Sequence, residues 1–243
     1  MNCKISIIIP AFNEAALLAT SLARIRDAAR AFDLAGFRWE LIVCDNNSSD
    51  ATPAIAAEAG ARVVFEPINQ IGRARNVGAA AAAGEWLVFI DADSHPSREL
   101  MADVAREIAG RRTLAGGSTV AIDHPSPAAR LAVAGWNLTS RFTRWAAGSF
   151  IFCDAAAFRE AGGFDLQLFA AEEIDLFRRL KRLAKSRRLA IRILSRHPLH
   201  TSARKAHLYS PREFLVFQLK TILSRGRTLR SADECALWYD GRR

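Results

Sequence analysis

The stretch that decides the fold runs from residue 86 to residue 93 and reads WLVFIDAD. Its first five residues are all apolar, and aromatic and β-branched side chains are among them, which predicts a strand that is buried on both faces. Two aspartates follow directly, separated by one alanine. A buried strand that ends in paired carboxylates indicates a sheet with a polar site beyond the strand's carboxyl end.

The same pattern of buried strands extends toward the N-terminus. Three more apolar runs precede this strand, at residues 5–9, 40–44 and 62–65. Helical patterns separate the runs, at residues 15–32, from Thr52 onward and at residues 75–83. Alternating strands and helices predict an α/β fold with a mostly parallel, doubly wound sheet.

The second half of the chain has a less regular pattern. Strands are predicted at residues 116–122, 148–152 and 191–194, and helices at residues 172–185 and 211–224. An amphipathic stretch rich in Trp and Arg lies between the first two of these strands. Its aromatic residues Trp136, Phe142 and Trp145, with Phe150 after them, have a spacing typical of core residues. A wall that packs against an acceptor is the alternative interpretation.

Composition narrows the class of protein. The chain has 243 residues, half of them apolar, which is enough for one large domain with a sizeable core. Its formal net charge of +9 indicates an anionic partner, such as a phosphorylated substrate, nucleic acid or an anionic membrane. Solvated helix faces and a basic tail explain the excess equally well. The four cysteines are far apart and have no metal-ligand spacing, so a reducing cytoplasm is expected. No apolar run approaches the ~18 residues of a membrane span.

Polar residues follow three of the predicted strands. Asn13 and Glu14 come after the first strand, Asp45 after the second, and Asp91 and Asp93 after the fourth. Because parallel strands present their carboxyl ends at one edge of a sheet, we expect these side chains to converge on one site. Oxygen ligands of this kind suit Mg²⁺ or Mn²⁺ that also binds substrate phosphates, although an isolated Asp-Ala-Asp is more often a turn.

Two polar side chains, one of them at a strand end, have a chemistry that suits a nucleotide. Asp45 can accept hydrogen bonds from a base or a ribose, and it can also build a turn. Arg75, near the start of a predicted helix, offers a fork for phosphate oxygens.

Taken together, the motifs resemble those of glycosyltransferase family 2. The resemblance lies in IPAFNE at 9–14, DNNSSD at 45–50, the Ala-Arg-Asn within residues 72–78, and Asp-Ala-Asp at 91–93. It continues in GGFD at 162–165 and EEIDL at 172–176, and it covers roughly residues 4–185. The resemblance implies a GT-A fold and an inverting transfer of sugar from a nucleotide diphosphate, most commonly UDP, to an acceptor hydroxyl.

The resemblance also implies roles for particular residues. Ala11, Asn13, Glu14 and Asp45 would line the nucleotide pocket, and Arg75 would reach the nucleotide or its diphosphate. Asp91 would contact the ribose or a Mn or Mg ion, and Asp93 would be the principal metal ligand. His200 is our choice for a further metal ligand, because enzymes of this fold often use a histidine late in the domain. A surface histidine is the alternative.

The later acidic motif supplies the candidates for a catalytic base. The family's usual Glu-Asp-x-Asp reads here as Glu172, Glu173, Ile174 and Asp175, so that Glu173 occupies the position of the usual catalytic aspartate. A positioned carboxylate can take the acceptor's proton as the hydroxyl attacks. Three acidic residues at a helix start can also simply complement the helix dipole. The choice among the three acidic residues therefore stays open.

The family resemblance also predicts how the chain divides into domains and which partners it binds. We expect one GT-A domain over residues 1–207, with a nucleotide-sugar-binding half to about residue 115 and an acceptor-side half after it. A basic helical extension would follow over residues 208–243. The expected partners are a nucleotide-sugar donor and a glycan, lipid-linked or small-molecule acceptor, in the cytoplasm with at most a peripheral membrane contact. No nucleic acid is expected as a partner. The alternatives are a sugar-phosphate nucleotidyltransferase, a nucleic-acid-binding protein and a non-catalytic scaffold.

Overall fold

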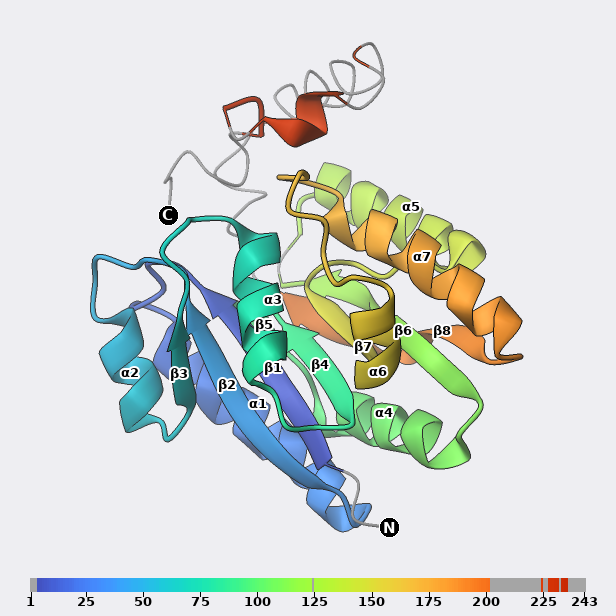
Figure 1. Ribbon diagram of the computed structural model, residues 1–243, viewed down its shortest axis with the longest axis horizontal. Coiled ribbons are helices and arrows are strands. Elements are labelled where there is room, and N and C mark those ends of the chain that lie inside the picture. Colours follow the sequence, from blue (N-terminus) through green and yellow to red (C-terminus); the bar gives the residue numbers. More distant parts are fainter. Residues whose placement is uncertain (1–3, 124, 202–223, 225–226, 232, 236–243) are drawn as a thin grey trace.

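A computed structural model describes residues 4–123, 125–201, 224, 227–231 and 233–235. Its elements follow the alternation expected from the sequence, and Figure 1 shows their arrangement. The strands are β1 (Lys4–Ala11), β2 (Arg38–Asp45), β3 (Arg62–Phe65), β4 (Trp86–Ile90), β5 (Ser94–His95), β6 (Thr113–Ile122), β7 (Phe150–Asp154) and β8 (Ala190–Thr201). The helices are α1 (Leu18–Leu34), α2 (Thr52–Glu58), α3 (Ile71–Ala81), α4 (Arg98–Gly110), α5 (Pro127–Thr143), α6 (Ala155–Glu160) and α7 (Glu172–Ser186), with a 3₁₀ turn at Arg227–Arg230.

All the strands belong to one mixed sheet in the order β3-β2-β1-β4-β7-β6-β8-β5. The first four in that order are parallel to one another, as the sequence predicted. β7 enters antiparallel between β4 and β6, and β5 closes the far edge antiparallel to β8. The predicted α/β class with a mostly parallel sheet is confirmed. The antiparallel strands join the expected acceptor-side half to the first half in a continuous sheet.

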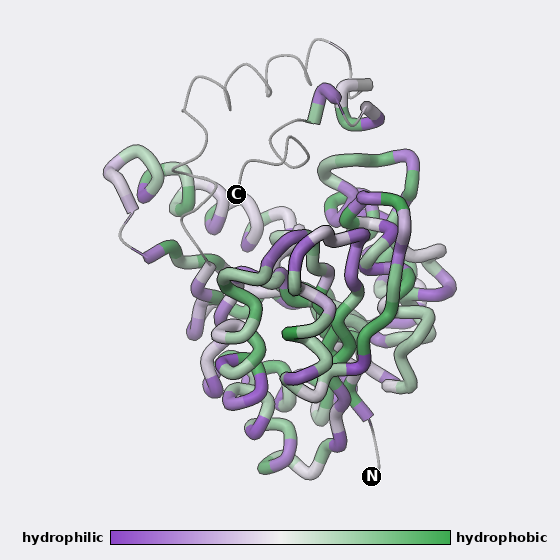
Figure 2. The backbone as a smooth tube through the Cα atoms, turned by 90° about the vertical axis from the view of Figure 1, so that its left-hand side faces the viewer, coloured by the Kyte–Doolittle hydropathy of each residue, from purple (hydrophilic) through white to green (hydrophobic). Residues whose placement is uncertain are grey.

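Apolar side chains cover both faces of this sheet. On one face, residues such as Ile7, Val43 and Val88 pack against α1, α2 and α4. On the other face, Ile8 and Phe89 pack with α3, α6 and α7. Figure 2 shows the strands as hydrophobic segments inside, with mixed colouring along the helices outside. This two-sided burial explains why the strands read as unbroken apolar runs.

Among the features that differ from the sequence prediction, two lie between residues 142 and 152. Phe150 lies in the core, but Phe142 on α5 is 89% exposed, so the core interpretation fails for Phe142. The strand predicted at 148–152 begins two residues later, at Phe150, because Gly148 and Ser149 form the approach to it. The predicted helix at 211–224 and most of the basic extension lie outside the described residues. No helix among the described residues is long and apolar enough to cross a membrane.

Candidate active site

The carboxyl ends of β1, β2 and β4 lie side by side. Ala11 and Asp45 are paired residues at the ends of β1 and β2. β4 pairs with the other side of β1, and Asp91 follows its last residue. The Asp91 backbone N–H donates to Ser149 O at 3.2 Å, which ties this end of β4 to the segment before β7. Three of the residues predicted for the site therefore share one edge of the sheet.

The segment after β1 is fixed against the segment after β2. The Asn13 backbone N–H donates to Ser48 Oγ at 3.0 Å, and Asn13 Oδ1 accepts the Ser49 N–H at 2.8 Å. The Glu14 N–H donates to Thr52 Oγ1 at 2.8 Å. Asn13 adopts a left-handed backbone with φ of 51°, a conformation that asparagine tolerates better than most residues. These bonds join the two polar segments to each other. The sequence had predicted that the two segments meet in space.

Asp45 and Asn46 organise the end of β2. Asp45 is 4% exposed, and its Oδ1 accepts the Ser48 N–H at 3.1 Å, so the predicted turn is present. The Asn46 side chain donates to Ile68 O at 2.6 Å and accepts the Gln70 N–H at 2.8 Å. Asn46 thereby joins β2 to the start of α3. Sequence reasoning missed this role, although Asn46 stands within the quoted DNNSSD motif.

Arg75 is the centre of the site. Its side chain is 2% exposed, and its Nη1 donates to Glu172 Oε1 at 2.7 Å. Its Nη2 donates to Asp91 Oδ1 and to Gly148 O, both at 2.9 Å. The guanidinium also lies 5.3 Å from the centre of the Phe164 ring. One arginine on α3 therefore joins the end of β4, the segment before β7 and the start of α7.

The charges around Arg75 are unbalanced toward acid. Burial alone would lower the pKa of Arg75, but the carboxylates of Asp91, Glu172 and Glu173 raise it. For the Glu173 carboxyl, burial and the neighbouring charge of Glu172 raise the pKa to about 8, against the opposing effect of Arg75. A carboxyl with such a pKa can hold or take a proton near neutral pH, as a general base must.

The start of α7 separates the three acidic candidates by their partners. Glu172 is bound to Arg75, whereas Asp175 binds Arg179 one turn along the helix, with Arg179 Nε 2.8 Å from Asp175 Oδ2. Glu173 faces the segment before β7, because a Cβ placed on Gly148 would lie 3.7 Å from the Glu173 carboxyl carbon. Ala171, just before the helix, has a left-handed backbone with φ of 60°, which costs energy for a residue other than glycine.

The GGFD segment is clamped onto α3. Asn76 Nδ2 donates to Phe164 O, and Asn76 Oδ1 accepts the Phe164 N–H, both at 2.9 Å. Gln70 Nε2 donates to Leu166 O and to Leu168 O, also at 2.9 Å. These bonds hold Phe164 beside Arg75. The sequence had shown the two motifs, at residues 72–78 and 162–165, but not that they bind each other.

Asp91 and Asp93 are the predicted metal ligands. Among the described residues, no three His, Cys, Asp or Glu side chains gather into a group that could hold a metal ion by themselves. Two carboxylates nevertheless fit Mg²⁺ or Mn²⁺, which commonly takes one or two protein carboxylates and completes its shell with phosphate oxygens and water. The metal assignment stays a prediction.

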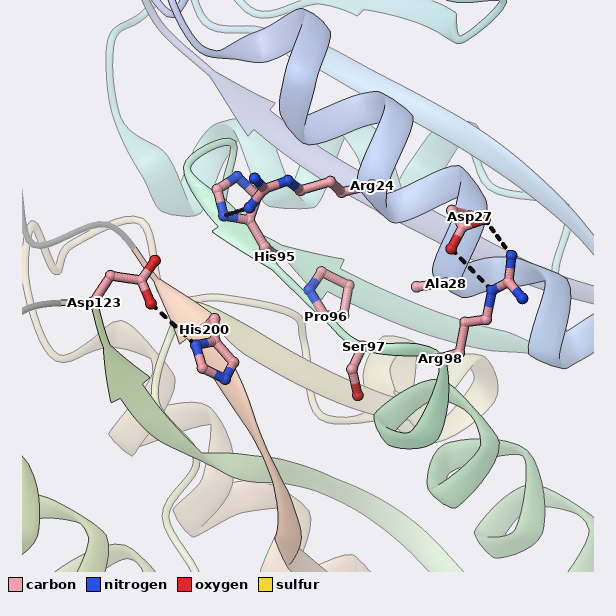
Figure 3. A pocket seen from close by; sticks show the side chains of 9 residues that line it. All are labelled: Arg24, Asp27, Ala28, His95, Pro96, Ser97, Arg98, Asp123 and His200. Atoms are coloured by element: carbon pink, nitrogen blue, oxygen red, sulfur yellow. Dashed lines mark hydrogen bonds and ion pairs between the residues drawn. The ribbon is translucent and has the colours of Figure 1, made fainter.

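His200 lies near the carboxyl end of β8, beside β5, which begins directly after Asp93, and it lines a pocket of about 440 Å³. It pairs with His95 across β5 and β8, and its Nδ1 is 3.2 Å from Asp123 Oδ1. Figure 3 shows His200 directed toward Asp123, while His95 contacts Arg24. His200 therefore contacts the carboxylate of Asp123, which directly follows β6. The role of His200 as a metal ligand stays a prediction.

The fold and this strand-end arrangement define the chain as a protein of the GT-A class. The sequence model described as Glycosyl transferase family 2 matches residues 6–161. The chain belongs to this family.

Similar proteins of known sequence match over shorter stretches. A TPR repeat-containing protein of Synechococcus elongatus is 42% identical over 82 residues, which are 33% of this chain and 18% of that protein. An uncharacterized glycosyltransferase of Mycobacterium bovis is 38% identical over 89 residues, which are 37% of this chain and 36% of that protein. The matches thus span well under half the length of these relatives.

Solved structures show the fold over nearly the whole chain. S. aureus TarS (residues 1–349), in complex with UDP, superposes with a TM-score of 0.64 and 20% identity, covering 98% of this chain and 70% of that one. Glucosyl-3-phosphoglycerate synthase from Mycobacterium tuberculosis, in complex with Mn²⁺, UDP and phosphoglyceric acid, gives a TM-score of 0.59 and 20% identity. That alignment covers 92% of this chain and 78% of the synthase.

Proposed function

We propose that this protein transfers a sugar from a nucleotide diphosphate sugar, with UDP as the nucleotide, to an acceptor hydroxyl. The observation that carries the proposal is the cluster of Asp91, Glu172 and Glu173 around the buried Arg75 at the carboxyl ends of the strands. Membership of glycosyl transferase family 2 favours sugar transfer over nucleotidyl transfer. The UDP bound to TarS and to the mycobacterial synthase supports UDP as the nucleotide here.

The nucleotide would bind across the ends of β1 and β2. Asp45 is buried at this edge, next to Ala11, and accepts hydrogen bonds only. It would bind a donor group of the base or the ribose. Asn13 and Glu14 would shape the wall of this pocket, because their backbones are held by Ser48 and Thr52.

Glu173 would be the general base. The acceptor hydroxyl forms the new bond to the anomeric carbon as the bond from that carbon to the diphosphate oxygen breaks. In that step Glu173 takes the hydroxyl proton, and the nucleoside diphosphate leaves with the bonding electron pair. A single displacement of this kind inverts the anomeric carbon. Glu172 and Arg75 would act by positioning, because each is bound to the other.

Asp91 and Asp93 would hold the divalent cation. When bound, a Mn²⁺ or Mg²⁺ ion would offset the negative charge that develops on the leaving diphosphate. Asp91 would help to hold the cation while it also accepts the hydrogen bond from Arg75.

Calorimetric titration tests the proposal. UDP, GDP and dTDP would be titrated into the protein with and without Mn²⁺, alongside Asp93→Ala. The matched control is Glu58→Ala, which removes an exposed carboxylate on α2. We expect UDP to bind in the presence of Mn²⁺, and Asp93→Ala but not Glu58→Ala to lose that binding. If folded protein binds none of the three nucleotides, the proposal is wrong.

A further inference from the structure

The outer face of α5 carries an unusual set of exposed apolar side chains. Leu131, Leu138 and Phe142 are 77%, 70% and 89% exposed. Their spacings of seven and four residues place them in one stripe along the helix. The opposite face of α5 packs on the sheet, where Asn137 exchanges two hydrogen bonds of 2.9 Å with the backbone of Val120. The stripe therefore points away from the protein.

Positive charge lies beside this stripe. Residues 125–153 include no Asp or Glu, and Arg130 and Arg141 are exposed beside the stripe. α7 lies next to α5 in Figure 1 and adds more cations. Arg178 Cζ and Lys181 Nζ each lie 5.4 Å from the centre of the Trp145 ring, just beyond the end of α5.

Burial is the main cause that lowers the pKa of Lys181, and the positive charges of Arg144 and Arg178 lower it further. An anionic surface would relieve the repulsion among these groups. A helix with Leu and Phe on one side and Arg beside them has the composition of helices that lie in a membrane interface.

Charge argues against the other possible occupants of the stripe. A second copy of the chain, related by a two-fold axis, would bring these cations onto their own equivalents. The chain's residues 202–223 carry four Lys and Arg residues and a single Glu, so they too would meet like charge. An anionic lipid surface matches both the apolar stripe and the cations.

We propose that the outer face of α5 docks the protein on an anionic lipid bilayer. The stripe of Leu131, Leu138 and Phe142 enters the interface, and the arginines beside it meet the lipid phosphates. From the end of α5 at Thr143, the chain reaches Gly148, whose carbonyl binds Arg75, in five residues. If the proposed function holds, this face also brings the site to an acceptor carried by the lipid layer. The docking itself does not depend on sugar transfer.

Vesicle flotation with the full chain tests the proposal. The vesicles would contain phosphatidylcholine alone or an equal mixture of phosphatidylcholine and phosphatidylglycerol. We expect the protein to float with the anionic vesicles at low salt and much less with the neutral ones. Leu138→Ser/Phe142→Ser should reduce partitioning by roughly tenfold for each side chain. Arg130→Gln/Arg141→Gln should reduce it by about fivefold for each arginine.

Matched variants on other faces serve as controls. Leu34→Ser removes an equally exposed apolar residue at the end of α1. Arg38→Gln/Arg112→Gln removes two exposed arginines, as the α5 double variant does, but one lies at the start of β2 and the other just before β6. Both should float as the parent does. The docking proposal is wrong if the parent does not bind anionic vesicles, or if the α5 variants float as well as the controls.

Two further measurements separate the causes of a negative result. Calorimetric binding of UDP by every variant checks that the site is folded, and a parent that floats without binding UDP would refute the proposed function but not the docking. Sedimentation velocity detects self-association. If the parent forms a dimer, does not bind vesicles, and loses the dimer in Leu138→Ser/Phe142→Ser, then this face binds a second copy of the chain. That result would overturn the membrane proposal.

Discussion

Replacing Arg75 with methionine removes the cation from the centre of the site. The change leaves Glu172, whose side chain is 4% exposed, and Asp91, which is 20% exposed, without their partner. Breaking a buried ion pair by removing one partner costs about 3–5 kcal/mol, because a charge stays buried without compensation. For a domain of this size each kcal/mol lowers Tm by about 2–4 °C. We therefore expect Arg75→Met to lower Tm by roughly 10 °C.

Urea denaturation followed by circular dichroism at pH 7 measures this loss of unfolding free energy. Arg73→Met is the matched control on the same helix. Arg73 pairs with Glu66 at 3.2 Å, but its own side chain is 30% exposed, so we expect a loss of about 1 kcal/mol or less. Equal losses for the two variants would refute the reasoning that burial of the Arg75 cluster determines its contribution.

A double variant isolates the pair. In Arg75→Met/Glu172→Leu the buried carboxylate is removed together with the arginine, and apolar side chains of similar size replace both. Replacing both partners in this way can be close to neutral. We expect the double variant to recover at least about 2 kcal/mol relative to Arg75→Met. Strictly additive losses would mean that the two residues contribute independently, against the geometry.

Four further predictions concern the site. Glu173→Gln should lower kcat by about 10²–10⁴-fold while UDP binding persists, since only the base is lost. In the parent, kcat/KM should rise with pH up to about 8 and level off above it, because Glu173 must lose its proton to act and its pKa is raised to about 8; a profile flat from pH 6 to pH 9 would contradict this. Asp45→Asn should weaken UDP binding by roughly tenfold or more in calorimetry, through loss of a charged acceptor. Gly148→Ala should lower kcat by roughly tenfold or more without unfolding, because its Cβ would lie 3.2 Å from Arg75 Nη2 and displace the guanidinium.

The sequence predicted the first half of the fold well, for a local physical reason. Strands covered on both faces, such as β1 and β4, must be apolar throughout, and that pattern is visible in a few residues. The position of β7 could not be read in the same way. Its residues lie 60 to 68 positions along the chain from their partners in β4, and no local pattern encodes that neighbour.

The site shows the same division between local and distant information. The polar residues after β1, β2 and β4 were found because each follows an apolar run. The partners of Arg75 were not found, because Glu172 lies 97 residues and Gly148 lies 73 residues away along the chain. The sequence assigned Arg75 to the nucleotide or its diphosphate, which stays a prediction, and the structure adds that its guanidinium is bound to Glu172, Asp91 and the Gly148 carbonyl. The sequence alone does not show that an arginine is buried, because burial of its charge requires partners that only the folded structure brings together.

The charge at the site bears on the proposed donor. The chain is basic overall, yet Asp91, Glu172 and Glu173 surround a single arginine. A diphosphate brought to this cluster alone would meet carboxylates, and in a poorly solvated site such repulsion is strong. Two changes reduce it, namely a proton on Glu173, whose pKa is already raised, and a divalent cation shared with Asp93. A protonated Glu173 cannot act as the base, so productive binding at neutral pH favours the divalent cation. Mn²⁺ should therefore strengthen the binding of UDP far more than that of uridine, which lacks the diphosphate.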